Sequence, residues 1–517
     1  MSYTTAGLAL VSILAMCLAV CRRSTIWHIP GPPSPSWLFG NMLQLLLSPQ
    51  YGDYEFEWLK IYGSVYRIKG CFGQDRLMVA DPAGLQYLIN SPHFVQGPVL
   101  ENVVNLLYGE KSVLGIKAGA AHRRVKAALN VGFTAGAVRG YQPVFERVAR
   151  LITEQLENAP VGPTDICPLL SLATLGAVSE AAAGYSLEDL GDQFVQNNTR
   201  VVALASGGSA IQVLSDAVGS YFPMWLMSSM IHLPTTAFKT LRDATVRANE
   251  LGAQIVREKT EAARQELEMD NDVFSLLLQD KSEKGLSDKE IIAQTAILLL
   301  AGQDTTANTL AFALLELAKH QDLQEKLRAE IHTTLGAAGA PVLYDSLPLL
   351  NAFIKEALRL YPTEPLSDRI AVQDAVIPLT NYITTASGER ITAMLVRKGQ
   401  LVTEAIASYH RLESQWGTDA EDFRPSRWID GSVNKGEAIG PWSRKNLLSL
   451  SFLGGPRTCL GWRFAVLEMQ VILAELVAKF SFELPQGESV QTRVITTLLP
   501  VDSEGKKAAP LHITRIL

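Results

Sequence analysis

The sequence predicts a mainly α-helical fold with a minor β part, preceded by one N-terminal transmembrane helix. A charge-free apolar run opens the chain, helical periodicity dominates from residue 120 onward, and strand-like runs are confined to the neighbourhoods of residues 70 and 390. The composition, with 47% hydrophobic and 19% charged residues among 517, excludes a disordered chain. Five scattered cysteines exclude a disulfide-stapled chain, and the net charge of −6 argues against nucleic-acid binding.

Residues 1–23 are predicted to anchor the protein in a membrane. Residues 1–21 carry no charged side chain, and at about 1.5 Å per residue they would span roughly 31 Å, enough to cross a bilayer. Arg22 and Arg23 follow at once. Positive charge after the apolar run indicates an anchor with the following chain in the cytosol, whereas a cleaved signal peptide, the alternative, carries that charge before the run.

Residues 24–40 form a predicted Pro-rich hinge between the anchor and a body of residues 41–517. The hinge holds four prolines within residues 30–35, which favour a stiff extended spacer. In the body, residues 64–80 are predicted to form two short strands, and residues 236–268 a long solvated helix. The apolar residues 205–235, broken by Gly and Pro, fit either buried core or a surface dipping into the bilayer.

A second long helix is predicted to run from residue 288 to Lys319. Ser287 and Glu290 form a capping box at its start. Its centre, residues 301–306, contains a glycine and two threonines, which are poor choices for helix stability, so another requirement is expected there. Further helices are predicted at residues 347–361 and 460–480, and short strands within residues 370–403.

Cys459 is the most informative residue for chemistry. It follows a Gly-rich turn at the predicted start of a helix, where free N–H groups and the helix dipole stabilise a thiolate. A thiolate can be a nucleophile, a redox thiol or a metal ligand. No resolving cysteine, zinc-type ligand spacing or His base is indicated, since residues 411–511 hold no other Cys or His. A lone thiolate suits axial ligation of haem iron.

At this stretch the sequence resembles the cytochrome P450 family. The family's haem-loop pattern F-x-x-G-x-R-x-C-x-G matches at five positions, and a chance match of this kind is rare: Phe452, Gly455, Arg457, Cys459 and Gly461. Leu453 departs from the small or polar residue that usually follows the Phe. The resemblance implies that residues 41–517 are a haem-thiolate catalytic domain with a long central helix over haem b. Cys459 would be the axial iron ligand, and Phe452, Arg457 and Gly461 would contact the haem.

Two further family motifs match. Glu356 and Arg359 fit E-x-x-R and share a helix face; with Arg427 they resemble the family's structural Glu-Arg-Arg triad. Residues 301–306 fit the pattern A-G-x-[DE]-T-[TS], in which the glycine, Gly302, would let the helix approach the haem. The resemblance implies that Asp304 and Thr305 form an acid–alcohol pair that relays protons during oxygen activation. The alternative for Asp304 is a salt bridge.

Haem propionates need cations or strong donors, and the resemblance implies several. Arg457 and the strand residue Arg369 match family positions. The family's W-x-x-x-R helix resembles residues 122–126, where His122 stands for Trp and Lys126 for Arg. The alternatives are a solvated face at these positions or contacts from the neighbouring arginines, Arg123 and Arg124.

A lipophilic small-molecule substrate is implied by the expected pocket lining, which is largely apolar. This lining comprises residues 96–107, 297–305, 363–366 and 496–499. The Pro-rich hinge and the Phe-Arg-Pro run at 423–425 resemble fungal microsomal members, many of which decorate terpenoids. The resemblance therefore suggests a secondary-metabolite enzyme in the endoplasmic reticulum membrane.

Electrons would come from a separate NADPH-cytochrome reductase, because little chain follows the Cys459 helix. Arg444, Lys445 and Arg463 are the basic residues expected at its docking surface. Two alternative functions would also use a bound haem: a peroxide-converting enzyme, and a non-enzymatic haem protein such as a gas sensor or a carrier. A reductase-independent isomerase or dehydratase of a peroxide often lacks the acid–alcohol pair, which is present here. A haem gas sensor would need a signalling module, which the sequence does not indicate, and a carrier would show no substrate-dependent NADPH use.

Overall fold

The computed structural model describes residues 24–160, 162–266, 271–280, 285–335, 342–433 and 449–516. The chain divides into two compact units, and each is considered by itself. The predicted anchor, residues 1–23, lies outside the described residues. Among the residues described, no single helix is long and apolar enough to cross a membrane, although α11 (Asp192–Ala205) and α12 (Ala210–Gly219) together pass such a test by length and composition.

The first unit comprises residues up to 103, 208–229 and 366–409, and it contains most of the β structure. Its five-stranded sheet has the order β1-β2-β8-β5-β3, with β2 and β8 parallel and the other pairs antiparallel. The strands are β1 (Val65–Lys69), β2 (Asp75–Val79), β3 (Phe94–Gln96), β5 (Leu366–Ala371) and β8 (Leu401–Ala405), and β6 (Ala375–Thr384) and β7 (Arg390–Val396) form a separate hairpin. Strands β1 and β2 confirm the two strands predicted within residues 64–80.

Short helices complete the first unit. They are α2 (Met42–Leu46), α3 (Glu55–Tyr62), η1 (Cys71–Gly73), α4 (Pro82–Asn90), α12 and α20 (Ile406–Tyr409), while α5 (Pro98–Tyr108) and α13 (Met224–Met230) lead into the second unit. The local sequence explains why helix α4 begins at Pro82. The proline ring fixes φ near the helical value, and the Asp81 carboxylate caps the helix by accepting the Gly84 N–H at 3.0 Å. In the apolar region 205–235, Ile211 and Trp225 are 78% and 69% exposed, so this region is not simply buried core.

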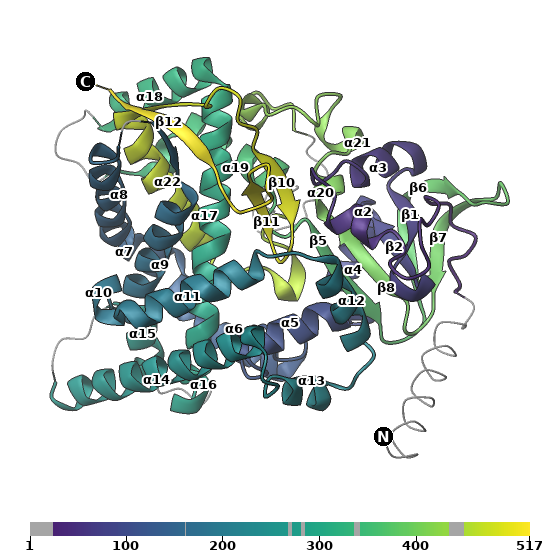
Figure 1. Ribbon diagram of the computed structural model, residues 1–517, viewed down its shortest axis with the longest axis horizontal. Coiled ribbons are helices and arrows are strands. Elements are labelled where there is room, and N and C mark those ends of the chain that lie inside the picture. The colour runs from purple at the N-terminus through teal and green to yellow at the C-terminus, as the bar shows by residue number, and fades with distance from the viewer. Residues whose placement is uncertain are drawn as a thin grey trace. The chain divides into compact units, whose positions relative to one another are not determined.

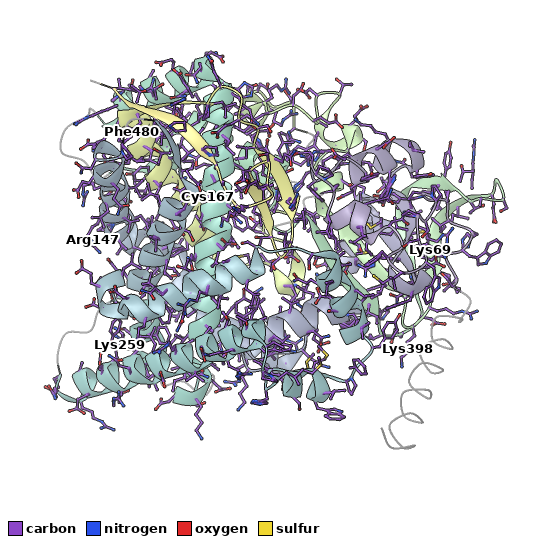
Figure 2. All side chains as sticks on the ribbon, in the orientation of Figure 1. Lys69, Arg147, Cys167, Lys259, Lys398 and Phe480 are labelled. Carbon is purple, nitrogen blue, oxygen red and sulfur yellow. The ribbon has the colours of Figure 1, made fainter. Side chains whose placement is uncertain are left out.

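The second unit comprises residues 104–207, 230–365 and 410–517 and is dominated by helices. In Figure 1 the long helix α17 (Thr295–Lys319) runs through this unit, and α9 (Cys167–Ala183), α19 (Pro348–Leu360) and α22 (Trp462–Lys479) pack against it. Cys167, at the start of α9, and Phe480, just after α22, are buried in its interior and are labelled in Figure 2.

The remaining elements of the second unit surround these four helices. The helices are α6 (Ala120–Leu129), η2 (Asn130–Phe133), α7 (Ala135–Gly140), α8 (Gln142–Glu157), α10 (Leu187–Leu190), α11, α14 (Thr236–Arg264), α15 (Val273–Gln279), α16 (Asp288–Ile292), α18 (Gln321–Leu335), η3 (Tyr344–Ser346), α21 (Glu413–Trp416), η4 (Pro425–Trp428) and η5 (Gly455–Arg457). One sheet has the order β4 (Pro163–Asp165), β12 (Pro510–Arg515), β9 (Phe480–Glu483), and β10 (Gln491–Val494) pairs with β11 (Leu498–Val501). Helices α14, α19 and α22 confirm three helices predicted from periodicity.

The helix predicted to run without a break from residue 288 to Lys319 is in fact two helices, so this prediction is wrong in part. The capping box of Ser287 and Glu290 is present, but the helix that it opens, α16, ends at Ile292, and α17 begins at Thr295. Between them lies Gln294, whose side chain is fully buried. Its amide accepts the Val113 N–H at 2.8 Å and donates to the Lys111 carbonyl at 3.0 Å. These contacts with the chain before α6 favour the break, and periodicity along one segment could not reveal them.

Candidate active site

Cys459 lies at the end of a tightly folded loop that leads into α22. The loop turns at Leu453 (φ 54°) and Gly455 (φ 59°), both in the left-handed region. The Cys459 N–H donates to the Phe452 carbonyl at 2.9 Å, and Gly461 is the N-cap of α22. A left-handed backbone costs an L side chain about 1–2 kcal/mol, so Leu453 strains the position where the family pattern has a small or polar residue.

The surroundings of the Cys459 thiol suit a metal ligand better than a free thiolate. Desolvation by the surrounding protein, together with the Glu364 carboxylate, raises the pKa of the thiol, and the Gly461 N–H and the Lys126 ammonium offset this only in part. The predicted contribution of the helix start is present, since the Gly461 N–H lowers the pKa, but it does not outweigh the desolvation. A metal ion bound to the sulfur removes the proton outright.

A basic cluster from α6 and the Cys459 loop lies near this thiol. Lys126 Nζ donates to two carbonyls of the loop, at 2.7 and 2.5 Å. Arg457 donates to three carbonyls of residues 113–116, the shortest contact being 2.8 Å to Ile116. His122 is buried, and burial together with the charges of Arg457 and Lys126 lowers its pKa to about 4. His122 is therefore neutral at pH 7 and can act only as a hydrogen-bond partner.

This donor set fits a haem. One thiol can ligate iron, Lys126 and Arg457 carry the positive charge that propionates require, and His122 adds a neutral ring N–H. Arg124 is engaged elsewhere, because it forms an ion pair with Glu290 and donates to the Gly285 carbonyl at 3.2 Å.

Arg369 belongs to the first unit, whereas the cluster belongs to the second. It is on β5 in the first unit, and its Nε donates to the buried Glu404 carboxylate at 3.1 Å. Burial raises the pKa of Glu404, and Arg369 opposes that rise. The expected contact of Arg369 with a propionate stays a prediction.

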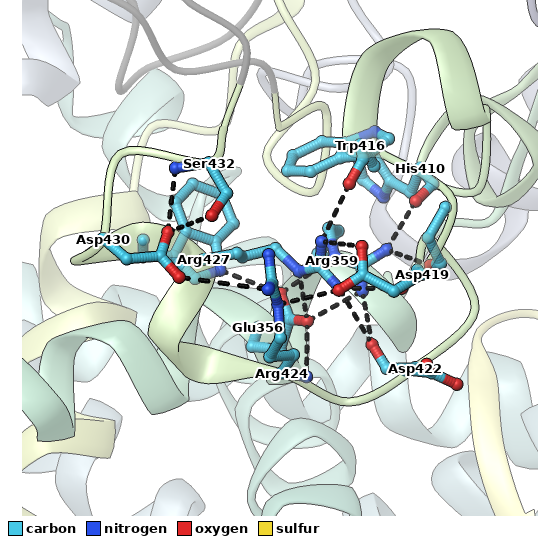
Figure 3. A network of polar contacts seen from close by, with 12 residues as sticks. Glu356, Arg359, His410, Trp416, Asp419, Asp422, Arg424, Arg427, Asp430 and Ser432 are labelled. Carbon is cyan, nitrogen blue, oxygen red and sulfur yellow. Dashed lines mark hydrogen bonds and ion pairs between the residues drawn. The ribbon is translucent and has the colours of Figure 1, made fainter.

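The structure brings Glu356, Arg359 and Arg427 together in a buried network (Figure 3). Arg359 donates to both carboxylate oxygens of Glu356, at 2.8 and 2.9 Å, and Arg427 Nε donates at 2.8 Å. The Trp428 indole N–H and the Arg424 backbone N–H complete the set, at 2.8 and 2.9 Å. Burial raises the pKa of Glu356, but the two guanidinium groups more than offset it, so the carboxylate is ionised.

This network also holds the start of the Cys459 loop. Arg359 donates to the His410 carbonyl at 2.7 Å, and His410 Nε2 accepts the Leu450 N–H at 2.9 Å. The Ser451 hydroxyl donates to the Leu358 carbonyl of α19 at 2.6 Å. Burial lowers the pKa of His410 well below its ordinary value, which keeps the accepting nitrogen unprotonated. Sequence reasoning missed His410, because it belongs to none of the matched motifs.

Asp304 and Thr305 are adjacent on α17, but their side chains have different partners. The Thr305 hydroxyl donates to the Ala301 carbonyl at 2.8 Å. The Asp304 carboxylate forms an ion pair with Lys507. The salt bridge that the sequence left open as an alternative is therefore present. Sequence reasoning missed Lys507, which is 203 residues away and lies in no motif.

The two residues before Asp304 tie α17 to its neighbours. A Cβ atom on Gly302 would lie 2.6 Å from the Val178 side chain of α9, so close helix packing favours glycine here. The expected role of Gly302 in admitting the haem stays a prediction. Gln303 is buried; its amide donates to the Ser171 hydroxyl at 2.8 Å and accepts from Asn198 of α11. Gly302 and Gln303 thus have tertiary neighbours on α9 and α11, whereas the printed contact of Thr305 is within α17.

Three of the four segments expected to line a substrate pocket meet within the second unit. The Leu498 N–H donates to the Thr363 carbonyl at 2.9 Å. The Thr497 hydroxyl lies 3.4 Å from the Asp304 carboxylate of α17, to which it can donate. The fourth segment, residues 96–107, crosses from the first unit into the second.

A family model and the similar curated proteins all point to the same family. The family model described as Cytochrome P450 matches residues 30–506. Cytochrome P450 monooxygenase 91 of Postia placenta is 29% identical over 96% of this chain and 96% of its own length. Cytochrome P450 monooxygenase claU of Ampulloclitocybe clavipes is 30% identical over 98% of this chain and 96% of its own length. Both similarities therefore cover most of the chain, and the family model spans the Glu-Arg-Arg residues and the Cys459 loop.

Proposed function

Because this chain belongs to the cytochrome P450 family, we propose that it is a haem-thiolate monooxygenase that inserts one oxygen atom from dioxygen into a lipophilic small molecule. The observation that carries the proposal is the Cys459 loop with its basic cluster of Lys126, Arg457 and neutral His122. Members of the family use haem b with an axial cysteine thiolate, and the relatives named above are monooxygenases.

Bound haem supplies the iron at which dioxygen is reduced and activated. Cys459 Sγ would hold the iron as a thiolate and would supply electron density that favours oxygen activation. Lys126 and Arg457 neutralise propionate charge. Asp304 is proposed to take protons from solvent and hand them to the Thr305 hydroxyl, which requires the carboxylate to turn away from Lys507. The presence of both groups favours a monooxygenase over a peroxide isomerase.

The proposed substrate class is a lipophilic secondary metabolite such as a terpenoid. The segments expected to line the pocket are largely apolar, with few polar points. The proposed location is the endoplasmic reticulum membrane, with one N-terminal anchor and a cytosolic catalytic body. Its support is the charge-free run of residues 1–21 followed directly by two arginines.

A groove of about 660 Å³ between α7, α19 and α22 is the proposed docking place of an NADPH-cytochrome reductase. Its lining includes the indoles Trp428 and Trp462, three cations and one carboxylate: Arg139, Lys355, Arg463 and Asp345. Excess positive charge beside aromatic surface suits an acidic protein partner. Arg463 was expected at this surface, whereas Arg444 and Lys445 lie outside the described residues.

The test is oxygen incorporation by the full chain in membranes that also contain a fungal NADPH-cytochrome reductase. A panel of terpenoid alcohols and hydrocarbons is supplied with NADPH and isotopically labelled dioxygen. The proposal expects a product that carries one labelled oxygen atom and forms only with NADPH and reductase. Conversion of a lipid hydroperoxide without NADPH, and no labelled product from any compound, would instead indicate the isomerase class.

A further inference from the structure

Tyr108, at the end of α5, carries a hydroxyl group that the protein itself does not satisfy. The side chain is half-buried, and within the part of the chain that the structure describes its hydroxyl has no hydrogen-bond partner. Desolvation raises the pKa of Tyr108 to about 12, and the charge of the Asp304 carboxylate adds to this rise. The hydroxyl therefore keeps its proton at neutral pH and can donate it in a hydrogen bond, and a Tyr O–H removed from water usually finds a partner.

The turn that follows Tyr108 closes the end of α5 and holds this residue in place. Gly109 adopts φ 82°, in the left-handed region that favours glycine. Its N–H donates to the Asn105 carbonyl at 3.0 Å, and its carbonyl accepts the Ser112 hydroxyl at 2.8 Å. Tyr108 thus lies on a helix end with satisfied backbone groups, which leaves its side chain as the unsatisfied group.

The segment around this turn is fastened to the two elements that carry the proposed chemistry. Gln294, just before α17, bonds with the backbone of residues 111 and 113. Arg457 of the Cys459 loop donates to the carbonyl of residue 116 at 2.8 Å. On the helical side, Leu107 lines a small cavity together with residues of α17. All these residues belong to the second unit, so Tyr108 is held between α17 and the Cys459 loop.

The chemistry around Tyr108 defines the group that would pair with it. Tyr108 directly follows residues 96–107, one of the largely apolar segments expected to line the pocket. One polar group in an apolar wall fixes the orientation of a ligand. The carboxylate of Asp304 nearby disfavours an anionic ligand group. A neutral carbonyl or hydroxyl oxygen, which accepts from the phenol, therefore suits this position.

We propose that Tyr108 determines specificity, because its hydroxyl donates a hydrogen bond to a neutral oxygen atom already present on the lipophilic substrate. The inference rests on the proposed function and narrows its substrate class to oxygenated lipophiles, to the exclusion of plain hydrocarbons. A preceding reaction must then have introduced a hydroxyl or carbonyl group. The hydrogen bond holds that end of the molecule at Tyr108 and so selects which carbon is presented for oxidation.

The test measures ligand affinity in the full-length haem protein. The probes are 1-phenylimidazole and its ortho, meta and para acetyl derivatives, whose imidazole nitrogen binds haem iron and shifts the Soret band. The acetyl group adds one neutral oxygen at three positions. Tyr108→Phe is expected to weaken at least one acetyl isomer about fivefold, the loss that one hydrogen bond corresponds to, and to leave the Kd of 1-phenylimidazole unchanged. The matched control is Tyr382→Phe, which removes the hydroxyl of a tyrosine that is 52% exposed on β6 and should leave all four affinities unchanged.

Three results would overturn the role of Tyr108. The first is equal affinity of wild type and Tyr108→Phe for every acetyl isomer, as expected for a hydroxyl that only binds water. The second is an equal loss for 1-phenylimidazole, which would mean that the hydroxyl does not distinguish an oxygen atom. The third is a lower thermal unfolding midpoint of Tyr108→Phe without ligand, which would show that the hydroxyl has a structural partner.

Failure of the proposed function would look different. Wild-type protein that shows no Soret shift with any of the four imidazoles, and no thiolate-type carbon monoxide spectrum, would overturn the haem-thiolate assignment itself. A normal carbon monoxide spectrum and normal imidazole shifts, with affinities that do not respond to Tyr108→Phe, would overturn the role of Tyr108 alone.

Discussion

Replacement of Glu356 by glutamine should strongly destabilise the protein, because it removes the carboxylate that pairs with Arg359 and one of the two carboxylates that pair with Arg427. Glu356 accepts five hydrogen bonds, three of them from Arg359 and Arg427, and all three side chains are at most 1% exposed. Removal of one partner from a buried ion network costs about 3–5 kcal/mol. This is a large part of the roughly 5–15 kcal/mol that stabilises a typical domain.

The assay is the thermal loss of carbon monoxide-reactive haem in the full chain, followed at a fixed heating rate because unfolding of a protein this large is often irreversible. At about 2 °C per kcal/mol, Glu356→Gln should lose its haem spectrum roughly 6–10 °C below the wild type. The matched control is Asp322→Asn on α18, which removes an exposed ion pair with Lys326 and should leave the midpoint unchanged. Equal midpoints for the two variants would refute the reasoning.

The effect of Glu356 should also have a defined pH range. The pKa of this carboxyl in the folded protein lies below its ordinary value of 4.5. Its contribution to stability is therefore fully present at neutral pH and is lost only as the pH falls below about 4.5. The difference between wild type and Glu356→Gln should be constant from pH 8 to pH 6 and shrink only in acid.

Three other predictions concern separate parts of the second unit. In the wild type, thermal stability should fall below pH 6.5, because His410 binds a proton in the unfolded chain but stays neutral when folded, where it accepts the Leu450 N–H. His410→Gln should make this fall shallower, and a pH curve identical to that of the wild type would contradict the prediction. Gly302→Ala should cost about 1–3 kcal/mol in chemical denaturation by overpacking against Val178, and the added change Val178→Ala should recover much of it. Thr305→Ala should increase peroxide release per NADPH consumed while the carbon monoxide spectrum stays normal, and unchanged coupling would remove its hydroxyl from the relay.

Local chemistry made much of the fold predictable. The capping box at Ser287, the amphipathic pattern of α14 and the proline after α19 each act within a few residues, and the structure has helices at all three places. The strands around Gly70 were predictable for the same reason. The break before α17 was not, because Gln294 is held by backbone groups of residues 111 and 113, far away in the sequence.

The candidate site was predictable where a motif fixes residue types at short spacing, as around Cys459 and Glu356. It was not predictable where a partner comes from a distant segment. Lys507 reaches Asp304 from a hairpin near the C-terminus, and His410 reaches the Cys459 loop from a segment with no motif.

The most direct test of the account is the carbon monoxide difference spectrum of the ferrous protein, recorded on membranes that contain the full chain. The account predicts a strongly red-shifted Soret band for the wild type, which requires the Cys459 thiolate on iron. It predicts that Cys459→Ala, expressed at a similar level, loses this band. A wild-type band at the unshifted position, or a red-shifted band that survives Cys459→Ala, would contradict the assignment of Cys459 as the axial ligand.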